Sequence, residues 1–203
     1  MRAARVVGRT AVLLEVGGHD EVAAWYAELV RQRDEGRIAA VDIVPAARTV
    51  LIDGLSDPHR TATELTDMAE PETARRDEGP LITVPTVYDG PDLADIAGRW
   101  NMSPEGVVRR HQEIEFEVAF CGFAPGFAYL TGLPPELRVP RLSEPRVSVP
   151  KGSVALADEY TAVYPAASPG GWRLLGRTDL VLFDLQRDPP SLLQPGTRVR
   201  FEA

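Results

Sequence analysis

The chain has 203 residues and a formal net charge of −8, from 22 basic and 30 acidic side chains. A chain of this length forms one large or two small domains and can bury about 70% of its unfolded surface without disulfides or metals. Because binding to nucleic acid or to an anionic membrane needs a net basic face, the charge argues against both, and we expect a small-molecule or protein partner.

The single cysteine and the N-terminal residues bear on the compartment. Cys121 has no second cysteine to pair with, so an oxidising environment is not implied, and its apolar run predicts a packing role. No apolar run approaches the ~20 residues that cross a bilayer. Arg9, Thr10 and Glu15 interrupt the first apolar stretch, and no small-residue cleavage site follows. We therefore expect a cytoplasmic protein.

The first 87 residues alternate between strand and helix patterns. Runs of β-branched and aliphatic residues predict strands, whereas capping residues before apolar positions spaced by three and four predict helices. The expected elements are a strand at 6–16, a helix from Asp20 to Gly36, strands at 38–44 and 49–52, a helix from Asp57-Pro58 to about 69, a loop at 70–80 and a strand at 81–87. The order β-α-β-β-α-β predicts a ferredoxin-like split βαβ domain over residues 1–85 of an α+β protein.

Two short helices are expected to link the halves of the chain, over residues 86–112. Asp92 to Trp100 has helical apolar spacing. Ser103 is positioned to cap the second helix, which runs to Arg110, and Pro104 takes its first position, where the missing N–H costs nothing.

Residues 113–203 are expected to be rich in short strands. The stretch 119–183 holds 15 Gly or Pro residues in 65 positions, and these residues mark turns between short extended runs. The expected strands lie at 115–120, 147–149, 154–156, 162–164, 180–185 and 198–201. Many short strands with turns between them predict a closed or nearly closed β-barrel, which leaves no long sheet edge exposed.

Four motifs follow one another in this stretch. They are GF-x-PGF-x-YL-x-GL from Gly122, the run PRLSEPRVSVPKGSV from Pro140, T-x-x-YP-x-x-SPGGW from Thr161, and LGRT from Leu175. In this order they resemble the B subunit of the bacterial 5-oxoprolinase, whose family is also called allophanate hydrolase subunit 1 or the Kip-type kinase inhibitors. The resemblance covers about residues 81–201 and implies a cyclophilin-like β-barrel.

The chain departs from the family pattern at one hairpin. Where the family has a run like G-I-A-G-x-Q-T-G-x-Y-P, this chain has Ala155, Asp158, Tyr160 and Ala162 in place of three glycines and a glutamine. The roles of Asp158, Glu159 and Tyr160 are left open by the sequence.

The resemblance implies the ATP-dependent opening of 5-oxo-L-proline to L-glutamate. Phosphorylation of the lactam carbonyl oxygen would activate an otherwise unreactive amide, with the charge balanced by Arg, Lys or Mg²⁺. In such families the B subunit works with a larger C subunit, of allophanate hydrolase subunit 2 type, and with an A subunit of LamB/YcsF type. ATP and Mg²⁺ are therefore the expected cofactors, held by this chain or by its partner, and the chain alone is expected to be inactive.

Two alternatives remain open. Some relatives inhibit a sensor histidine kinase by docking on its dimerisation helices, which needs an exposed apolar patch and no nucleotide site. The older family name points to allophanate hydrolysis, but the chain lacks the Ser-Ser-Lys motif of an amidase. That alternative ranks last.

His111 follows the family pattern and is the expected general acid or base, because an ordinary histidine pKa lies near neutrality. A structural role at the end of its helix is an equally open interpretation. His111 and Glu115 have the i,i+4 spacing of a metal pair, but a helix end is expected between them, so we predict no metal site.

Basic residues and a Gly-rich turn form the second candidate set. Arg146 and Lys151 are predicted to bind an anion as catalytic clamps, because Arg grips a carboxylate or phosphate with two parallel hydrogen bonds and a Pro-Gly-Gly turn can point several N–H groups at one anion. The residues predicted to bind substrate or phosphate are Arg141, Ser168, Gly170, Gly171, Arg177 and Tyr164. The alternative is a solvated loop whose arginines pair with Glu136, Glu144 and Asp179.

Aromatic residues near the Gly-Pro turns form the third set: Phe123, Phe127, Tyr129, Tyr160, Tyr164 and Trp172. Such residues can line a pocket over a flat ring, or they can fill a core or an interface between subunits. An interface or core role is favoured for Phe123 and Phe127, and both interpretations stay open for Tyr164 and Trp172.

Overall fold

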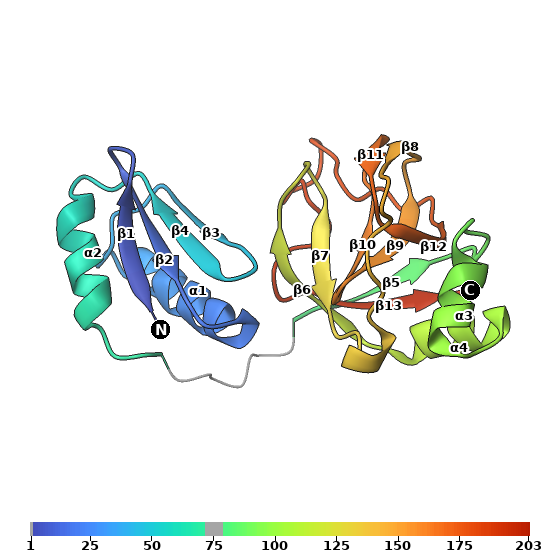
Figure 1. Ribbon diagram of the computed structural model, residues 1–203. Helices are drawn as coiled ribbons and strands as arrows, with labels where there is room; N and C mark the ends of the chain where they lie inside the picture. Colours follow the sequence, from blue (N-terminus) through green and yellow to red (C-terminus); the bar gives the residue numbers. More distant parts are fainter. Residues whose placement is uncertain (1, 72–78) are drawn as a thin grey trace. The chain divides into compact units, whose positions relative to one another are not determined.

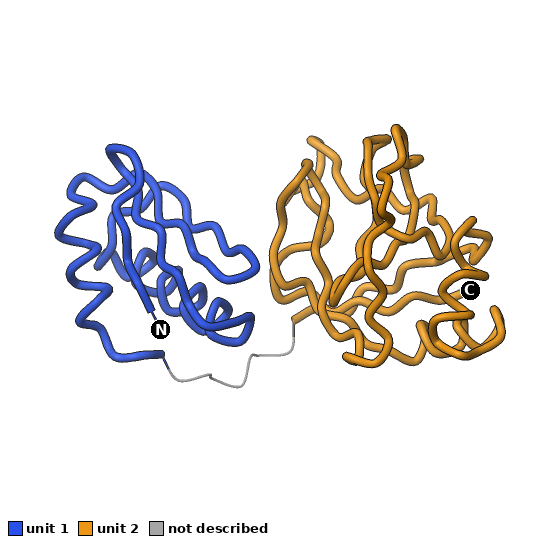
Figure 2. The backbone as a smooth tube through the Cα atoms, in the orientation of Figure 1, with its two compact units in different colours: residues 1–77 blue, residues 78–203 orange. Residues whose placement is uncertain are grey.

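The structure is a computed structural model that describes residues 2–71 and 79–203. The chain divides into two compact units, residues 1–77 and residues 78–203, which Figure 2 shows in different colours. Each unit has its own hydrophobic core.

The first unit is a four-stranded antiparallel sheet in the order β1-β2-β4-β3, with two helices (Figure 1). Its elements are β1 Ala3–Val7, β2 Ala11–Glu15, α1 His19–Asp34, β3 Asp42–Pro45, β4 Thr49–Asp53 and α2 Pro58–Asp67. Alternate residues of β2 and β4, such as Leu14 and Ile52, are buried with Trp25 and Leu29 of α1 and Leu65 of α2. Both helices therefore pack on the same face of the sheet.

The ferredoxin-like order expected for residues 1–85 is not what the first unit shows. The strand expected at residues 6–16 is a hairpin, because Gly8 takes a φ of 64° and starts a turn that reverses the chain. The strand expected to complete this domain, β5 Leu81–Pro85, pairs instead with a strand of the second unit. The element order of the first unit is β-β-α-β-β-α.

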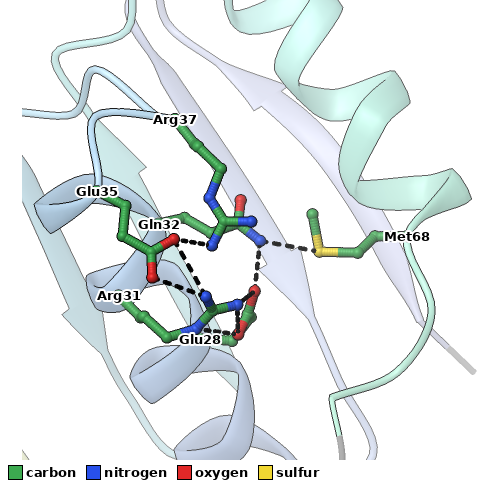
Figure 3. Close-up of polar contacts among 6 residues, drawn as sticks. All are labelled: Glu28, Arg31, Gln32, Glu35, Arg37 and Met68. Carbon is green, nitrogen blue, oxygen red and sulfur yellow. Dashed lines mark hydrogen bonds and ion pairs between the residues drawn. The ribbon is translucent and has the colours of Figure 1, made fainter.

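The end of α1 is tied to the chain that follows α2. Gln32 is buried, and its Nε2 atom donates hydrogen bonds to Glu28 Oε1 at 2.6 Å and to Met68 Sδ at 3.5 Å (Figure 3). Arg31 bridges Glu28 and Glu35 on the solvent side of the same turn. The bond from Gln32 to Met68 therefore links the end of α1 to the residue that follows α2, whereas the ion pairs of Arg31 stay within α1 and its C-terminal end.

The second unit contains a seven-stranded sheet in the order β12-β9-β10-β7-β6-β13-β5 and a two-stranded ribbon of β8 and β11 (Figure 1). Its elements are β5, α3 Leu93–Trp100, α4 Pro104–Glu113, β6 Phe116–Cys121, β7 Ala128–Thr131, the 3-10 helix Pro135–Leu137, β8 Arg146–Val149, β9 Ser153–Ala157, β10 Tyr160–Val163, β11 Ser168–Gly170, β12 Arg173–Arg177 and β13 Arg198–Glu202. All strand pairs are antiparallel except β13 with β5.

The edges of this sheet are joined. The backbone of Val87, just after β5, exchanges two hydrogen bonds with Arg177 of β12, at 2.8 and 2.9 Å. Gly90 N donates a further bond to Leu175 O at 3.0 Å. The sheet therefore curls until the segment that follows β5 meets β12, which gives it the shape of a half-barrel.

The two faces of the sheet are packed differently. One face carries what we call the helix-side core, a set of buried apolar residues that includes residues of α3 and α4, such as Trp100 and Val107. The other face carries the ribbon-side cluster, which consists of Phe127, Val149, Ala155, Ala157, Ala162, Tyr164, Trp172 and Leu174. Successive residues of β9 alternate between them, so this strand is buried on both sides.

Some elements of the second unit differ from the prediction. β7, β11 and β12 were not expected, and α4 continues past Arg110 to Glu113. The strand expected at 180–185 is absent, since that segment makes only one bridge, between Phe183 and Ser191. The apolar side chains of Leu180 and Leu182 pack against the core of the second unit, but the backbone of this segment does not join the hydrogen bonds of the seven-stranded sheet.

The predicted starts of two helices are confirmed. Asp57 accepts a hydrogen bond from Arg60 N at 3.0 Å, and Ser103 Oγ accepts one from Gly106 N at 3.2 Å. The predicted cap of α1 at Asp20 is wrong: the helix starts at His19, and it is the Glu21 carboxylate that accepts a hydrogen bond, from Gly17 N at 2.8 Å. In residues 2–71 and 79–203, no helix combines the length and apolar character that crossing a bilayer demands.

Candidate functional site

Four aromatic rings pack together beside the ribbon. Phe120 stacks on Tyr129, with ring centroids 4.4 Å apart and 17° between the ring planes. Tyr160 meets these two rings edge-on at 5.7 and 5.6 Å, and Trp172 meets Tyr129 edge-on at 5.7 Å. Phe120 and Trp172 are buried, whereas Tyr129 and Tyr160 are partly exposed. We call these four residues the aromatic platform.

The tyrosines of this region remain protonated at neutral pH. Burial raises the pKa of Tyr160 to about 12, and it also raises the pKa of Tyr129 and of Tyr164. The positive charge of Arg141 acts in the opposite direction on the pKa of Tyr129 and of Tyr164. Tyr164 is buried and the Tyr160 hydroxyl is hydrogen-bonded to Glu159, so among these three hydroxyls it is that of Tyr129 that can donate a hydrogen bond to a ligand.

Two arginine–carboxylate pairs lie at the rim of the platform. Arg138 pairs with Glu159 at 3.2 Å, and Arg141 lies 3.6 Å from Asp158. Asp158 takes a φ of 52° in the β9–β10 hairpin, and its N–H donates a hydrogen bond to Val139 O at 2.7 Å. The hairpin in which this chain departs from the family pattern thus supplies the acidic partners of this rim.

Arg146, predicted to be an anion clamp, already has its acceptors within the protein. Its Nη2 atom donates to both oxygens of Asp92, at 2.7 and 2.8 Å, and its Nη1 atom donates to Trp172 O at 3.1 Å. Asp92 is buried and also accepts from Leu174 N at 2.7 Å. This pair fastens β8 to the start of α3 and to β12, which is a structural role.

Lys151 and Arg177 lie near each other at the turn between β8 and β9. The hydrogen bond from Thr178 N to Gly152 O, at 2.8 Å, brings that turn beside the end of β12. Lys151 is exposed and has no polar partner in the described part of the chain. Arg177 donates to Asp89 Oδ2 at 2.9 Å. Lys151 is therefore available to an anion, whereas Arg177 is occupied.

The predicted glycine cradle is part of the ribbon. Ser168 and Gly170 pair with β8, and Gly171 O accepts a hydrogen bond from Leu142 N at 2.7 Å. A Cβ atom at Gly170 would collide with the hydroxyl of Tyr164, which is buried. The Ser168 hydroxyl is buried without a hydrogen-bond partner among the described residues. Close packing on Tyr164 therefore accounts for a glycine at position 170.

His111 lies on the other face of the sheet, inside the helix-side core. It is fully buried, its ring centroid lies 5.1 Å from that of Phe116 and 4.6 Å from that of Phe201, and its Nδ1 atom is 2.9 Å from the hydroxyl of Tyr88. Burial lowers the pKa of His111 to about 3, so the ring is neutral at physiological pH. This position matches the structural interpretation, and the acid–base role stays a prediction that the burial does not support.

The structure thus brings together only part of the predicted set. Arg141, Arg146, Tyr164, Ser168, Gly170 and Gly171 gather on the ribbon side, Lys151 and Arg177 lie at the far end of β8, and His111 is separate. Sequence reasoning missed Phe120 and Asp92. Phe120 lies within an apolar run that predicted only a strand, and Asp92 is separated from Arg146 by 54 positions.

The described residues do not form a metal centre, because they contain no group of three His, Cys, Asp or Glu side chains close enough to hold an ion. Cys121 donates to Leu193 O at 3.3 Å, and burial raises its pKa to about 11. A thiol of that pKa is a poor nucleophile, in agreement with the predicted packing role.

Comparison with known proteins identifies the family to which the chain belongs. The model of the family described as "Carboxyltransferase domain, subdomain C and D" matches residues 2–193. Among curated proteins, the B subunit of 5-oxoprolinase from Escherichia coli O157:H7 is 39% identical over 97% of this chain and 93% of its own length. The protein of the same name in Bacillus subtilis (strain 168) is 40% identical over 74% of this chain and 65% of its own length. The chain belongs to the family of 5-oxoprolinase B subunits, and its likeness extends into the first 80 residues.

Several solved structures share the fold of this chain. TTHA0988 is 33% identical, with a TM-score of 0.75 over 95% of this chain, which spans 39% of TTHA0988. PH0987 from Pyrococcus horikoshii is 32% identical, with a TM-score of 0.58 over 98% of this chain and 96% of its own. The urea amidolyase of K. lactis shares the fold at 21% identity, with a TM-score of 0.73 over 99% of this chain and 15% of its own.

Proposed function

We propose that this chain is the B subunit of an ATP-dependent 5-oxoprolinase, which opens 5-oxo-L-proline to L-glutamate in the cytoplasm together with relatives of the C and A subunits. The observation that carries the proposal is the 39% identity to the E. coli protein over nearly the full length of both chains. Within this proposal the second unit is a cyclophilin-like barrel, and its ribbon side faces the substrate.

The residues of this chain do not by themselves fit ATP and Mg²⁺. The described residues lack a cluster of metal ligands, and the guanidinium of Arg146 is held by Asp92 and by Trp172 O. Lys151 alone of the two predicted clamps is free to meet a phosphate. The proposal therefore assigns ATP and Mg²⁺ to the partner, and this chain contributes binding and orientation of the lactam.

The second unit also exposes apolar side chains, as expected if its site is shared with another subunit. Phe123 is 63% exposed and Leu185 is 77% exposed, and Gly126 packs directly against Phe183, which is 37% exposed. Exposed apolar residues that gather in this way are typical of protein interfaces. We assign this surface to the relative of the C subunit within the proposed complex.

The test is reconstitution. This chain is assayed alone and after co-expression with its relatives of the C and A subunits, and glutamate and phosphate release are followed with and without 5-oxo-L-proline. We expect lactam-dependent release of both products only from the assembled mixture. An assembled complex that releases no glutamate from the lactam would refute the proposal.

A further inference from the structure

The arginines of the ribbon side differ in whether their N–H groups already have acceptors. Arg146 uses its donors on Asp92 and on the backbone of Trp172, as described above. Arg173 is buried, and it donates to Pro140 O at 2.9 Å and to Asp95. Neither side chain can bind a ligand without breaking contacts that hold the unit together.

Arg141 is different. Its side chain is 59% exposed, and its nearest acidic atom, Asp158 Oδ2, lies 3.6 Å from Nε, which is too long for a hydrogen bond. Within the described residues its N–H donors have no hydrogen-bond acceptor. A guanidinium presents its donors in a planar fork that matches a carboxylate, so the fork of Arg141 is available to an incoming acid.

The position of Arg141 is nevertheless defined. Its guanidinium carbon lies 5.9 Å from the centroid of the Trp172 ring, within the range of a cation–π contact. Trp172 in turn packs against Tyr129 of the platform. The free fork therefore lies beside a flat, partly exposed aromatic surface that is held rigid by ring packing.

We propose that Arg141 binds the carboxylate of the substrate while the five-membered ring lies against the partly exposed ring of Tyr129. This inference rests on the proposed function and assigns one contact within it. The loose pairing with Asp158 orients Arg141 before binding, and because Asp158 is 61% exposed, its release into water costs little.

The test compares variants of the assembled complex on two ring compounds. 5-Oxo-L-proline carries the carboxylate, whereas 2-pyrrolidinone has the same lactam ring without it. Loss of a charge-assisted contact that forms equally in the ground state and the transition state raises KM and leaves kcat unchanged. For Arg141→Ala we expect KM for 5-oxo-L-proline to rise about 10- to 100-fold, with kcat within about threefold.

The preference for the carboxylate gives a readout that a merely structural role would not move. The ratio of kcat/KM for 5-oxo-L-proline to that for 2-pyrrolidinone should fall in Arg141→Ala and recover in part in Arg141→Lys, which restores the charge but not the fork. The matched control is Arg138→Ala, which removes a half-exposed arginine with one acidic partner from the same rim and should leave the ratio unchanged.

The possible outcomes distinguish a failure of this inference from a failure of the proposed function. If the wild-type complex opens the lactam and Arg141→Ala keeps its KM and its substrate ratio, the inference is wrong and the proposed function stands. The inference is equally wrong if Arg138→Ala lowers the ratio as much as Arg141→Ala, because general electrostatics would then explain the effect. If the assembled wild-type complex does not open the lactam, the function fails and the inference fails with it.

Discussion

The two faces of the seven-stranded sheet bury their polar groups in opposite ways. On the helix side, His111 has no exposed surface and a ring nitrogen without a partner among the described residues. On the ribbon side, Tyr129 and Tyr160 are partly exposed and Arg141 has unused donors. A histidine in the helix-side core adds stability only while it stays neutral, whereas the ribbon side keeps donors that a ligand can use. A residue that follows a family motif, such as His111, can therefore lie in the core and away from the face that has unused donors.

The strands themselves explain why the ribbon side has room for large rings. β9 directs Val154 and Leu156 to the helix-side core and Ala155 and Ala157 to the ribbon-side cluster. Small side chains on one face let the rings of the ribbon-side cluster lie close to the sheet. The larger residues of β9 therefore fill the helix-side core, and its alanines leave space for aromatic rings on the ribbon side.

Arg146→Ala should give the largest effect on stability. It leaves the buried carboxylate of Asp92 without its cation, and we expect the free energy of unfolding to fall by about 2 to 3 kcal/mol, below the full cost of breaking a buried pair because the Arg146 side chain is 26% exposed. Urea unfolding followed by tryptophan fluorescence in a Trp25→Phe background reports on the second unit.

Arg141→Ala is the matched comparison, since it removes the same side chain five positions away. Its loss should change the free energy of unfolding by less than about 1 kcal/mol, because its contacts are an exposed pair with Asp158 and one long cation–π contact with Trp172. Equal losses in the two variants would remove the distinction between a structural and a free arginine.

The pH dependence of stability tests the helix-side core. Burial lowers the pKa of His111 to about 3, while an unfolded histidine titrates near 6.5, so between these values only the unfolded chain binds the proton. Above about pH 6.5, neutral His111 makes its full contribution to the free energy of unfolding. As the pH decreases below that value, the free energy of unfolding falls by up to about 1.4 kcal/mol per pH unit. Urea unfolding between about pH 7 and pH 5 measures this slope.

The control is His111→Phe combined with Tyr88→Phe, which keeps the rings and removes both polar partners. Its slope should be lower than that of the wild type over the same pH range. An unchanged slope would mean that His111 is not buried as the structure shows.

The smallest effect is expected at the rim. Glu159→Gln breaks the pair with Arg138, whose two side chains are 42% and 47% exposed, and should cost less than about 0.5 kcal/mol. The thermal midpoint should move by no more than about 2 °C. A larger loss would show that the β9–β10 hairpin depends on its charges and would weaken the contrast between rim and core.

Local signals in the sequence predicted helices better than strand pairing. Asp57-Pro58 and Ser103-Pro104 marked two helix starts correctly, because capping and proline placement act within one turn. β5 was assigned to the wrong unit, because its partner β13 lies more than a hundred residues away and nothing in residues 81–85 specifies it. The β1–β2 hairpin was missed because one glycine at positive φ reverses the chain without a common turn motif.

The candidate site shows the same division. The motifs contain Tyr129, Tyr164 and Trp172 of the ribbon side, but the ribbon itself was not expected, because the pairing of β8 with β11 joins segments about 20 residues apart. They did not show that Arg146 is paired with Asp92 or that His111 is buried, because both depend on contacts between distant segments. Whether an arginine is free or paired is a property of the folded chain.

The position of β13 has a consequence for synthesis on the ribosome. β13 lies between β6 and β5, so the sheet of the second unit stays split until residues 198–202 have left the exit tunnel. The strands and helices of the first unit are complete by residue 67 and pair only with near neighbours. The first unit can therefore form while the second is still being made, and during that interval β5 and β6 carry unpaired edges that invite association with other chains.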